Sequence, residues 1–535
     1  MRIIPCRGCF RPEEPVAFFL RETGEGRTFS VQITNLRETV YTEVFEPEDG
    51  SCVLTLSRGF CEAGGYGVLC ISDSGETART AFDIQDGNTV LRYGFLSDFF
   101  PDDSDDSDIE AMAEHHINTV QFYDWSYRHD RLVADREQYT DMMGKHNSLP
   151  VIRRKIAACH AAGMKAMAYG AVYAAGEEFA TAHPEWRLYA GEDRPIRFID
   201  VFSIMNLRTA WREHIIRQYK SAVTEMGFDG IHMDTYGFPK TALDYEGRIV
   251  HLEKDFPELI SDTRSALPDA ALIFNNVGGW PLECTMNTGV DAVYIEVWPP
   301  YDRYCHLKQL ILKAKESGKP VILAAYPSAF RTSRDDRALY SELLLMCAIQ
   351  SHGATQLWFG EEYAAITQGY YSDYARLTAA QRMTLKNYDD FFVRYGQLFF
   401  SSDLKDVSMT HFGWDNLEYL CSRSCSVSGE PGKLWLVLRE GKNEKLISVI
   451  NLCGLETDRW AEGQNEPVPQ ENTDISLQYF GRIKHVLCAS PDDQTGDLKP
   501  CRYSSEQGNR SKVLKIILPT VKTFMFIWVG LCDDT

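Results

Sequence analysis

Two regions of short strand-like segments flank a longer region in which apolar runs alternate with helical periodicity. In residues 1–90, apolar or alternating segments are separated by Gly, Asp and Glu turns, and they read VAFFL, FSVQITNL, CVLTL and YGVLCISD. Strands at this spacing predict a small β-sandwich. Residues 401–535 show the same pattern in KLWLVLRE, KLISVINL, SLQYFGRIKHVLC, KVLKIILP and TFMFIWVG. They predict a second β-sandwich.

The central region, residues 91–400, contains eight apolar runs with helical segments between them. The runs are RYGFLSDF, TVQFYDW, KAMAYGAVY, GIHMDTYG, ALIFNNV, AVYIEVW, PVILAAY and TQLWFG. Helical segments such as VIRRKIAACHAAG and YCHLKQLILKAKESG end in glycine, which commonly follows the last helical turn. Nearly continuous apolar runs are typical of parallel strands buried on both faces. Eight strand–helix units predict a central (β/α)8 TIM barrel in a multidomain chain.

Composition and charge narrow the classes of function. The chain has 535 residues, of which 44% are hydrophobic and 24% charged, which excludes disorder of the whole chain. Asp and Glu number 76 against 55 Lys and Arg, a net charge of −21. Such an acidic chain is repelled by phosphate backbones and anionic lipids, and no apolar run reaches the 18 residues of a membrane span. We therefore expect neither a nucleic-acid nor a membrane partner.

The cysteines and the start of the chain bear on its compartment. Fifteen cysteines, an odd number, are scattered along the chain, and the start MRIIPCRGCFRPEEP lacks the apolar core of a secretory signal. Unpaired cysteines favour a reducing environment. We expect a cytoplasmic protein, or a secreted one if a leader has been lost.

Metal binding has two weak candidates. The pairs Cys6/Cys9 and Cys421/Cys425 lie too far apart in sequence for an ordinary structural zinc site. The acidic stretch PDDSDDSDIE (101–110) either begins a helix, whose N-terminus favours carboxylates, or holds calcium. We expect no metal in the site and no cofactor.

The chemistry of a TIM barrel lies at the carboxyl ends of its strands. Asp234 ends the fourth run and Glu296 the sixth. A carboxylate within an apolar run is costly to bury unless its charge is paired or used. Either residue could pair with a neighbouring Arg or Lys. Two carboxylates at one aromatic rim instead indicate the nucleophile and the general acid of glycosidic bond cleavage, the acid needing a raised pKa.

Aromatic and polar residues crowd the same predicted rim. Flat sugar faces pack on aromatic rings, and hydroxyl groups need polar partners. The residues assigned to substrate binding are Asp124, Trp125, Tyr127, Arg128, Tyr169, Tyr173, His232, Tyr236, Asn275, Asn276, Trp298 and Tyr326. The expected stacking platforms are Trp125, Tyr127, Tyr173 and Trp298, and the expected partners of hydroxyls are Asp124, Asn275 and Asn276. For any single aromatic, ordinary core packing is an equal alternative. His232 either contacts substrate or orients Asp234, and Arg128 either neutralises Asp124 or contacts hydroxyls.

Five segments together resemble glycoside hydrolase family 66, which holds endo-dextranases and cycloisomaltooligosaccharide glucanotransferases. They are INTVQFYDWSYRHD, GMKAMAYGAVYAA, GFDGIHMDTYG, FNNVGG and AVYIEVWPP. The resemblance implies an N-terminal immunoglobulin-like domain (1–90), a catalytic barrel (91–400) and a C-terminal β-domain (401–535). It also implies action on α-1,6-linked glucans with retention of configuration, Asp234 being the nucleophile and Glu296 the acid/base.

The chain departs from the family pattern in two places. Between the seventh and eighth runs, SAFRTSRDDRALYSELLLMCAIQSHG leaves no room for the carbohydrate-binding module that the family's glucanotransferases insert, which favours hydrolysis. The eighth run continues as TQLWFGEEY, whereas the family suggests an acidic residue nearer the strand end, which leaves the glucan preference open. We expect hydrolysis of dextran or isomaltooligosaccharides. Transglycosylation, glucan binding without catalysis and action on another α-linked sugar are the alternatives.

Overall fold

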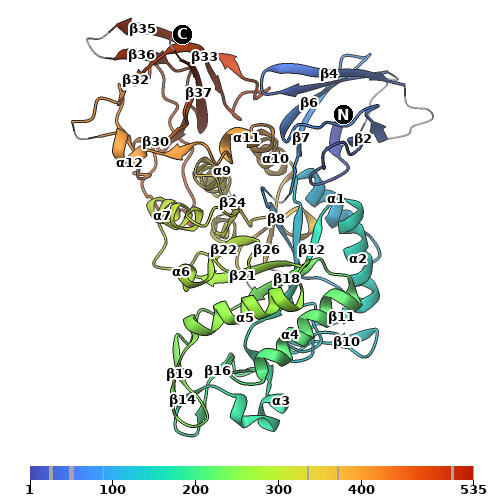
Figure 1. The fold of residues 1–535 in the computed structure, drawn as a ribbon. Coiled ribbons are helices and arrows are strands. Elements are labelled where there is room, and N and C mark those ends of the chain that lie inside the picture. The colour runs from blue at the N-terminus through green and yellow to red at the C-terminus, as the bar shows by residue number, and fades with distance from the viewer. Residues whose placement is uncertain are drawn as a thin grey trace.

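The computed structural model describes residues 1–22, 28–46, 53–87, 89–333, 336–369, 373–413, 415–507 and 511–533. At its centre lie eight parallel strands (Figure 1). In spatial order they are β8 (Tyr93–Leu96), β9 (Thr119–Phe122), β12 (Lys165–Ala171), β18 (Gly230–Asp234), β21 (Ala271–Val277), β22 (Ala292–Glu296), β23 (Val321–Ala324) and β24 (Thr355–Gln356). A parallel bridge between Gly94 and Phe359 joins the first strand to the segment after the last. The sheet therefore closes into the predicted TIM barrel.

Helices between the strands cover the outside of the barrel. The longer ones are α1 (Ser107–Glu114), α2 (Leu149–Ala161), α4 (Trp211–Ser221), α5 (Leu252–Ala266), α7 (Tyr304–Lys315), α9 (Asp336–Ser351) and α10 (Ala379–Arg394). In α2, Ile152, Ile156 and Cys159 recur at helical spacing and are buried. Gly163 after α2 and Gly318 after α7 have φ of 67° and 74°, the left-handed region that glycine adopts without strain. The glycine signals therefore mark helix ends as predicted.

Small sheets extend the barrel after β12 and β18, and the sequence analysis did not predict them. One contains β15 (Arg194–Pro195), β14 (Tyr189–Gly191), β19 (Thr241–Leu243) and β20 (Ile249–His251); another contains β13 (Ala174–Gly176), β17 (Phe202–Ile204) and β16 (Arg197–Phe198). Figure 1 shows these hairpins at the end of the molecule farthest from both termini. They enlarge the rim at the carboxyl ends of the barrel strands.

Two sheets with a shared apolar core form the N-terminal region. One contains β1 (Arg2–Pro5), β2 (Ala17–Arg21) and β5 (Val53–Thr55), and the other β4 (Glu38–Phe45), β3 (Phe29–Asn35), β6 (Gly64–Ser72) and β7 (Thr77–Ile84). Phe18 of the first sheet and Val31 and Phe82 of the second belong to one buried cluster.

The C-terminal region also has two sheets around one core, which includes Leu436 and Leu477. The larger sheet contains β27 (Lys405–Asp406), β29 (Cys425–Ser426), β30 (Leu434–Glu440), β31 (Glu444–Asn451), β37 (Phe524–Cys532), β33 (Arg482–Ala489) and β34 (Lys499–Pro500). The smaller contains β28 (Tyr419–Cys421), β32 (Asp474–Tyr479), β36 (Lys512–Ile517) and β35 (Arg502–Gln507). The run SLQYFGRIKHVLC, expected as one strand, is divided between β32 and β33. Gly481, at φ 79°, turns the chain from one sheet to the other.

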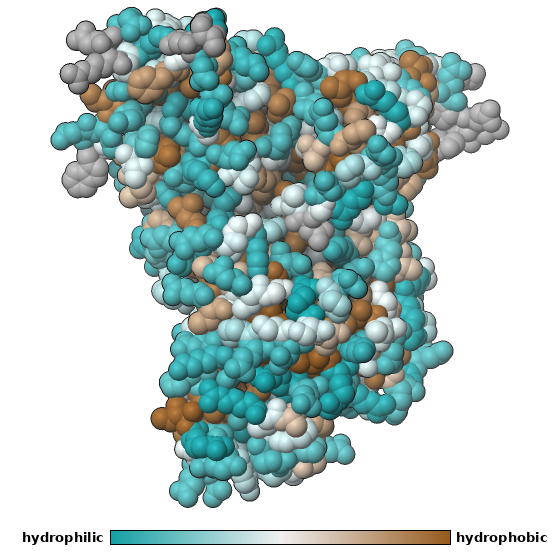
Figure 2. Space-filling view, viewed as in Figure 1, coloured by the Kyte–Doolittle hydropathy of each residue, from teal (hydrophilic) through white to brown (hydrophobic). Residues whose placement is uncertain are grey.

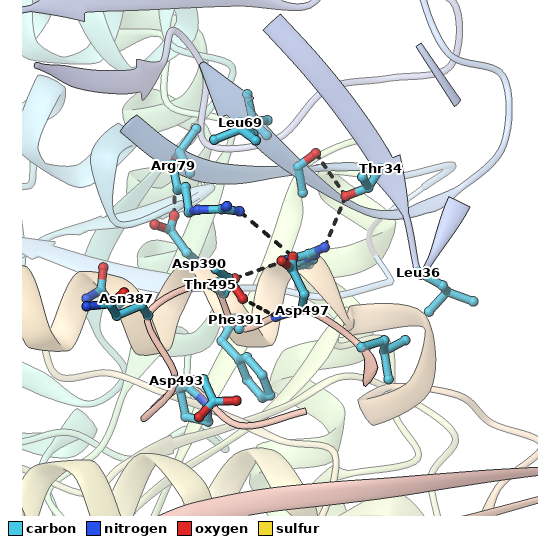
Figure 3. Close-up of a pocket in the computed structure, with 18 of the residues that line it drawn as sticks. Thr34, Leu36, Leu69, Arg79, Asn387, Asp390, Phe391, Asp493, Thr495 and Asp497 are labelled. Carbon is cyan, nitrogen blue, oxygen red and sulfur yellow. Dashed lines mark hydrogen bonds and ion pairs between the residues drawn. The ribbon is translucent and has the colours of Figure 1, made fainter. Parts of the chain in front are cut away.

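The three regions meet at α10. Arg394 of this helix donates to Asp497 of the C-terminal region at 2.7 Å and to Thr34 of β3 at 3.1 Å. Arg79 of β7 approaches Asp497 at 3.8 Å, beside a cavity of about 330 Å³ (Figure 3). These charges neutralise one another across the junction, so the barrel and both β-regions are tied together.

The visible surface in Figure 2 is mainly hydrophilic, with apolar side chains in small separate groups. Within the described residues, no helix is long and apolar enough to cross a bilayer.

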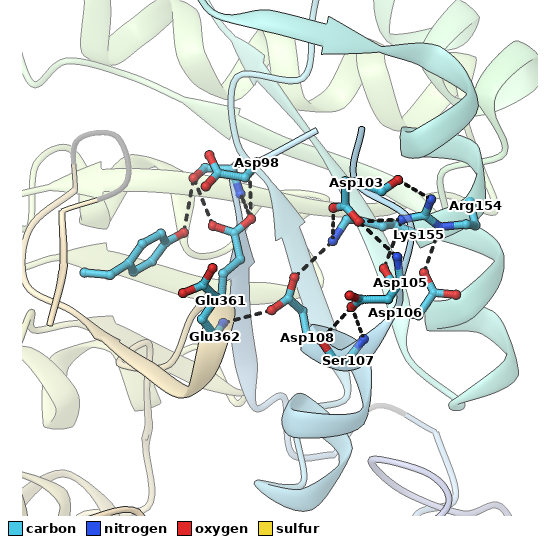
Figure 4. Close-up of polar contacts among 12 residues, drawn as sticks. Asp98, Asp103, Asp105, Asp106, Ser107, Asp108, Arg154, Lys155, Glu361 and Glu362 are labelled. Atoms are coloured by element: carbon cyan, nitrogen blue, oxygen red, sulfur yellow. Dashed lines mark hydrogen bonds and ion pairs between the residues drawn. The ribbon is translucent and has the colours of Figure 1, made fainter. Parts of the chain in front are cut away.

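The acidic stretch 101–110 leads into α1, and Asp108 and Glu110 lie in the first turn of that helix. Arg154 pairs with Asp103 at 2.8 Å and with Asp106 at 3.0 Å. Lys155 pairs with Asp103 at 2.9 Å and with Asp108 at 3.0 Å (Figure 4). Cations of α2 thus hold these carboxylates. Nowhere in the described part of the chain do three His, Cys, Asp or Glu side chains gather as a metal site would require. The structure favours the helix-start interpretation of this stretch over calcium.

Glu361 closes the barrel seam. Its Oε1 accepts hydrogen bonds from the backbone N–H groups of Ser97 and Asp98, both at 2.7 Å, and its Oε2 accepts one from Ser97 Oγ at 3.2 Å (Figure 4). Burial, then the charge of Asp98, raise the pKa of Glu361 to about 7.

We expect Glu361→Ala to lower the free energy of unfolding by about 2–4 kcal/mol, because two buried N–H groups lose their acceptor. Glu361→Gln is the matched control, since an amide oxygen can accept both bonds and the raised pKa already favours a neutral group. Thermal and denaturant unfolding measure the effect. Equal stability of the alanine variant and the wild type would contradict the stabilising role given to the hydrogen bonds of Glu361.

Candidate active site

A pocket of about 310 Å³ opens at the carboxyl ends of the barrel strands. Asp234 and Glu296 are the last residues of β18 and β22, and β21 lies between these two strands. Side chains alternate along a strand, so Tyr294 and Glu296 share the face of β22 that points into the barrel. The pocket therefore receives one carboxylate from each side of β21.

Asn275 of β21 joins the two carboxylates. Its Nδ2 donates to Asp234 Oδ1 at 2.7 Å and to Glu296 Oε2 at 3.0 Å. The two acceptor oxygens therefore lie no farther apart than these two distances laid end to end. Tyr169 OH donates to Asp234 Oδ2 at 2.9 Å, and Tyr326 OH donates to Glu296 Oε1 at 3.0 Å. Each carboxylate is therefore held by Asn275 and by a tyrosine hydroxyl.

The surroundings shift the ionisation of both carboxyl groups. Burial and, next, the charge of Glu296 raise the pKa of Asp234 from 3.8 to about 7, against the hydrogen bonds from Asn275 and Tyr169. Burial also raises the pKa of Glu296, against its own hydrogen bonds. Two like charges so close disfavour double ionisation. The pair therefore keeps one proton to a higher pH than an isolated carboxyl group would.

The structure brings half of the predicted site residues to this pocket. The predicted residues that line it are His232, Asp234, Tyr236, Asn275, Glu296, Trp298 and Tyr326. The His232 ring lies against Tyr294, its Nδ1 is 3.0 Å from Tyr93 OH, and burial lowers its pKa to about 3. His232 was expected either to contact substrate or to orient Asp234. Its position in the pocket lining suits contact with substrate, made by a neutral ring.

Three predicted residues point into the protein instead. The Trp125 indole is fully buried and donates to the Tyr169 carbonyl at 3.1 Å. The buried Tyr173 hydroxyl donates to the Phe238 carbonyl at 2.8 Å. Asn276 follows Asn275 on β21, so alternation turns it outward, where it donates to the Tyr294 carbonyl at 2.9 Å. These contacts correct the stacking assigned to Trp125 and Tyr173 and the hydroxyl binding assigned to Asn276.

The remaining four predicted residues, Asp124, Tyr127, Arg128 and Tyr169, are not among the residues that line the pocket. Tyr169 acts through its bond to Asp234. Asp124 has a φ of 47° and is buried. Its Oδ1 lies 3.4 Å from His129 Nε2. The Arg128 guanidinium lies over the Tyr127 ring at 4.1 Å and donates to the carbonyls of Tyr127 and Thr140. The structure thus gives Arg128 two carbonyl partners, and Tyr127 stacks with a protein cation.

Several lining residues were not predicted as site residues. They are Phe95, Gln121, Tyr123, Phe198, Thr235, Phe238, Val277, Tyr294 and Gly369. Tyr294 could have been found, because it is two positions before Glu296 on one strand. Phe198 and Phe238 come from the unpredicted hairpin region, and no local pattern marks them. Gly369 approaches the acid so closely that a Cβ there would lie 2.7 Å from Glu296 Oε1.

We expect Asn275→Ala to reduce activity about 10–100-fold, because the amide that holds both carboxylates in register is lost. With that donor gone, the pKa of each carboxyl group rises, so the alkaline limb of the pH–rate profile moves to higher pH. Steady-state rates across pH measure both effects. A variant with an unchanged profile would contradict the bridging role.

A closed barrel with a buried, hydrogen-bonded carboxylate pair in an aromatic pocket is an arrangement typical of barrel enzymes that act on glycosidic bonds. The chain belongs to glycosyl hydrolase family 66, whose sequence model matches residues 16–527. This membership confirms the resemblance noted from the sequence.

Relatives with known names fall in two groups. A cycloisomaltooligosaccharide glucanotransferase of Niallia circulans is 26% identical over 370 residues, covering 61% of this chain and 38% of the relative. A dextranase of Streptococcus salivarius is 24% identical over 388 residues, covering 61% of this chain and 46% of the relative. The chain thus spans less than half the length of either relative.

A crystal structure of a Paenibacillus sp. cycloisomaltooligosaccharide glucanotransferase, complexed with cycloisomaltoheptaose, has a similar fold. Its TM-score is 0.88 at 20% identity, with 99% of each chain covered. An α-amylase from Geobacillus thermoleovorans gives a TM-score of 0.54 at 10% identity, covering 84% of this chain and all of the other.

Proposed function

We propose that this protein is a retaining glycoside hydrolase that cleaves α-1,6-glucosidic linkages in dextran or isomaltooligosaccharides. The observation that carries the proposal is the Asn275 bridge, which holds Asp234 and Glu296 side by side in the pocket. Membership of family 66 and the names of the relatives support an α-1,6-glucan as substrate.

In the proposed mechanism, the Asp234 carboxylate attacks the anomeric carbon as the bond to the glycosidic oxygen breaks. The Glu296 carboxyl group gives its proton to the departing oxygen. A covalent glycosyl ester on Asp234 results. Glu296, now ionised, takes a proton from water, the water oxygen attacks the anomeric carbon, and Asp234 is released. The two displacements together retain the configuration.

The spacing of the carboxylates supports retention. The facing oxygens, Asp234 Oδ1 and Glu296 Oε2, lie within the two Asn275 hydrogen bonds of 2.7 and 3.0 Å laid end to end, whereas the carboxyl groups of inverting pairs are roughly 6.5–9.5 Å apart. This proximity is compatible with the roughly 5–5.5 Å of retaining pairs. The wider spacing of inverting pairs is what makes room for a water between the base and the sugar.

Transglycosylation uses the same two residues and differs in what attacks the glycosyl ester. Transglycosylation is the second candidate function, because two of the relatives are glucanotransferases. Between β23 and β24, the described chain forms α8 (Ala329–Thr332) and α9. This short helical connection supports hydrolysis, since it leaves no space for an inserted sugar-binding module.

The decisive experiment is a product assay. The protein is incubated with dextran and with an isomaltooligosaccharide ladder, with Asp234→Asn as the control, and products are analysed by mass. Shorter linear products made by the wild type alone are expected, with the α-anomer formed first in NMR. Cyclic or longer products would establish the transferase instead. Binding without products would favour a non-catalytic glucan-binding protein. If the protein neither binds nor cleaves dextran or the isomaltooligosaccharides, the assignment of an α-1,6-glucan as substrate is wrong.

A further inference from the structure

One loop of the C-terminal domain reaches the rim of the active site. This loop, residues 456–464, is part of the connection between β31 and β32, yet its Trp460 is only 6% exposed and belongs to the apolar cluster of the barrel. It contacts the segments that follow β22 and β23, the strands that precede Trp298 and Tyr326 in the pocket. A contact that served only to hold the two domains together would not need to involve the segments after β22 and β23.

The first contact is with the segment after Glu296. Trp460 Nε1 donates to the Tyr301 carbonyl at 2.8 Å, and Trp460 N donates to the Asp302 carbonyl at 3.2 Å. The Asp458 carboxylate accepts Arg303 Nη1 at 2.8 and 2.9 Å. Tyr304 N, at the start of α7, donates to the Asp458 carbonyl at 3.0 Å. The loop therefore holds residues 301–304 by both side chains and backbone.

From this segment the contacts continue to the acid. Tyr301 N donates to the Trp298 carbonyl at 3.0 Å. Trp298 lines the pocket, and its side chain hydrogen-bonds Glu296. Only four residues separate Glu296 from Tyr301 along the chain, so displacement of Tyr301 would move the Trp298 ring and with it the Glu296 carboxyl group.

A second route reaches the same carboxyl group from β23. Ser328 Oγ donates to the Ala461 carbonyl at 3.2 Å, and Ser328 N donates to the Tyr326 carbonyl at 2.7 Å. Tyr326 OH donates to Glu296 Oε1. The Asp234 side chain, by contrast, accepts hydrogen bonds from Tyr169 and Asn275, which both belong to barrel strands. Both routes from the loop end on the acid and not on the nucleophile.

We propose that loop 456–464 of the C-terminal domain is a positioning element for Glu296, with Trp460 and Asp458 as its positioning residues. This proposal rests on the function proposed above, since it assigns the C-terminal domain a part in proton donation. Loss of either contact would leave the nucleophile in place and misalign the proton donor.

The test compares two leaving groups. Trp460→Phe keeps an apolar ring and removes the donor to Tyr301, and Asp458→Ala removes the partner of Arg303. Trp528→Phe is the matched control, because Trp528 Nε1 donates to Glu444 Oε2 at 2.9 Å within the same domain. Asp493→Ala is the second control, as Asp493 pairs with Lys499 at 3.0 Å. The substrates are isomaltotriose, which needs a proton on its leaving oxygen, and 4-nitrophenyl α-isomaltoside, which needs almost none.

For Trp460→Phe and Asp458→Ala, we expect kcat/KM on isomaltotriose to fall about 10–100-fold and on the nitrophenyl substrate to change little. Both substrates are measured with the same preparation of each variant, so the ratio of the two kcat/KM values does not depend on the fraction of folded enzyme. Both controls should keep the wild-type ratio. An unchanged ratio in both loop variants would overturn the proposal, since a purely structural brace lowers both rates equally.

Hydrogen exchange of residues 297–304 gives a readout that needs no turnover. Exchange there should be faster in Trp460→Phe and Asp458→Ala than in the controls, with the rest of the barrel unchanged. If the wild type cleaves neither substrate, the proposed function is wrong. The exchange measurement still tests whether loop 456–464 holds residues 297–304. Unchanged exchange at 297–304 would overturn the positioning role.

Discussion

Asp234→Asn should abolish turnover, with a loss of about 10⁴-fold or more in kcat on isomaltooligosaccharides. An amide has the shape of the carboxylate but cannot form the glycosyl ester. The substitution also removes one of two like charges held together by Asn275, so we expect the fold to be kept and substrate binding to survive. Rates measured at saturating substrate, with affinity from calorimetry, separate these effects.

Two outcomes would contradict the role of Asp234. Retention of more than about 1% of wild-type activity by a preparation free of wild-type enzyme would exclude it as the nucleophile. Loss of activity accompanied by loss of thermal stability would show that the charge serves the fold. Glu361→Gln is a suitable comparison, since it also removes a buried carboxyl group beside barrel strand ends but lies outside the pocket lining.

Glu296→Gln should lower activity on natural linkages by about 10²–10⁴-fold, the usual contribution of a general acid. The effect should be far smaller on 4-nitrophenyl α-isomaltoside, whose leaving group departs without a proton. Added azide should then accelerate turnover and give a glycosyl azide of retained configuration, because an anion needs no base to attack the ester. Mass spectrometry and NMR of the products check both statements.

The pH dependence supplies a second test of Glu296. Burial raises the pKa of this group, so the protonated form that donates to the leaving oxygen persists to higher pH and is lost as pH rises through that pKa. In the wild type this loss forms the alkaline limb of kcat/KM. The limb should disappear in Glu296→Gln. An alkaline limb that survives the substitution would assign proton donation to another residue.

Half of the site could be predicted from local sequence, and the reason is the period of a strand. A carboxylate at the end of an apolar run lies at the barrel rim whatever the register of its neighbours, which is why Asp234 and Glu296 lie together in the pocket. The same reasoning cannot decide between Asn275 and Asn276, because the run ALIFNNV does not show which phase of the alternation points inward. The structure turns Asn275 in and Asn276 out.

The aromatic residues show where local reasoning ends. Trp298 and Tyr326 line the pocket, whereas Trp125 and Tyr173 are buried and do not line it. Each of the four is the last residue of a predicted apolar run, so their sequence positions are alike. Their orientation depends on loops after the strands, where the chain leaves the regular alternation: Asp124, directly before Trp125, has a positive φ.

By itself, the sequence determined the order of the barrel strands and helices, the barrel class and the two carboxylates, because these depend on apolar periodicity within short windows and on strand ends. Only the tertiary structure decided which rings face the substrate, how Asn275 joins the two acids, and that Trp460 reaches the segment after Glu296. Those contacts join residues far apart in the chain, and their geometry is set by the packing of whole elements, which no local pattern of residues encodes.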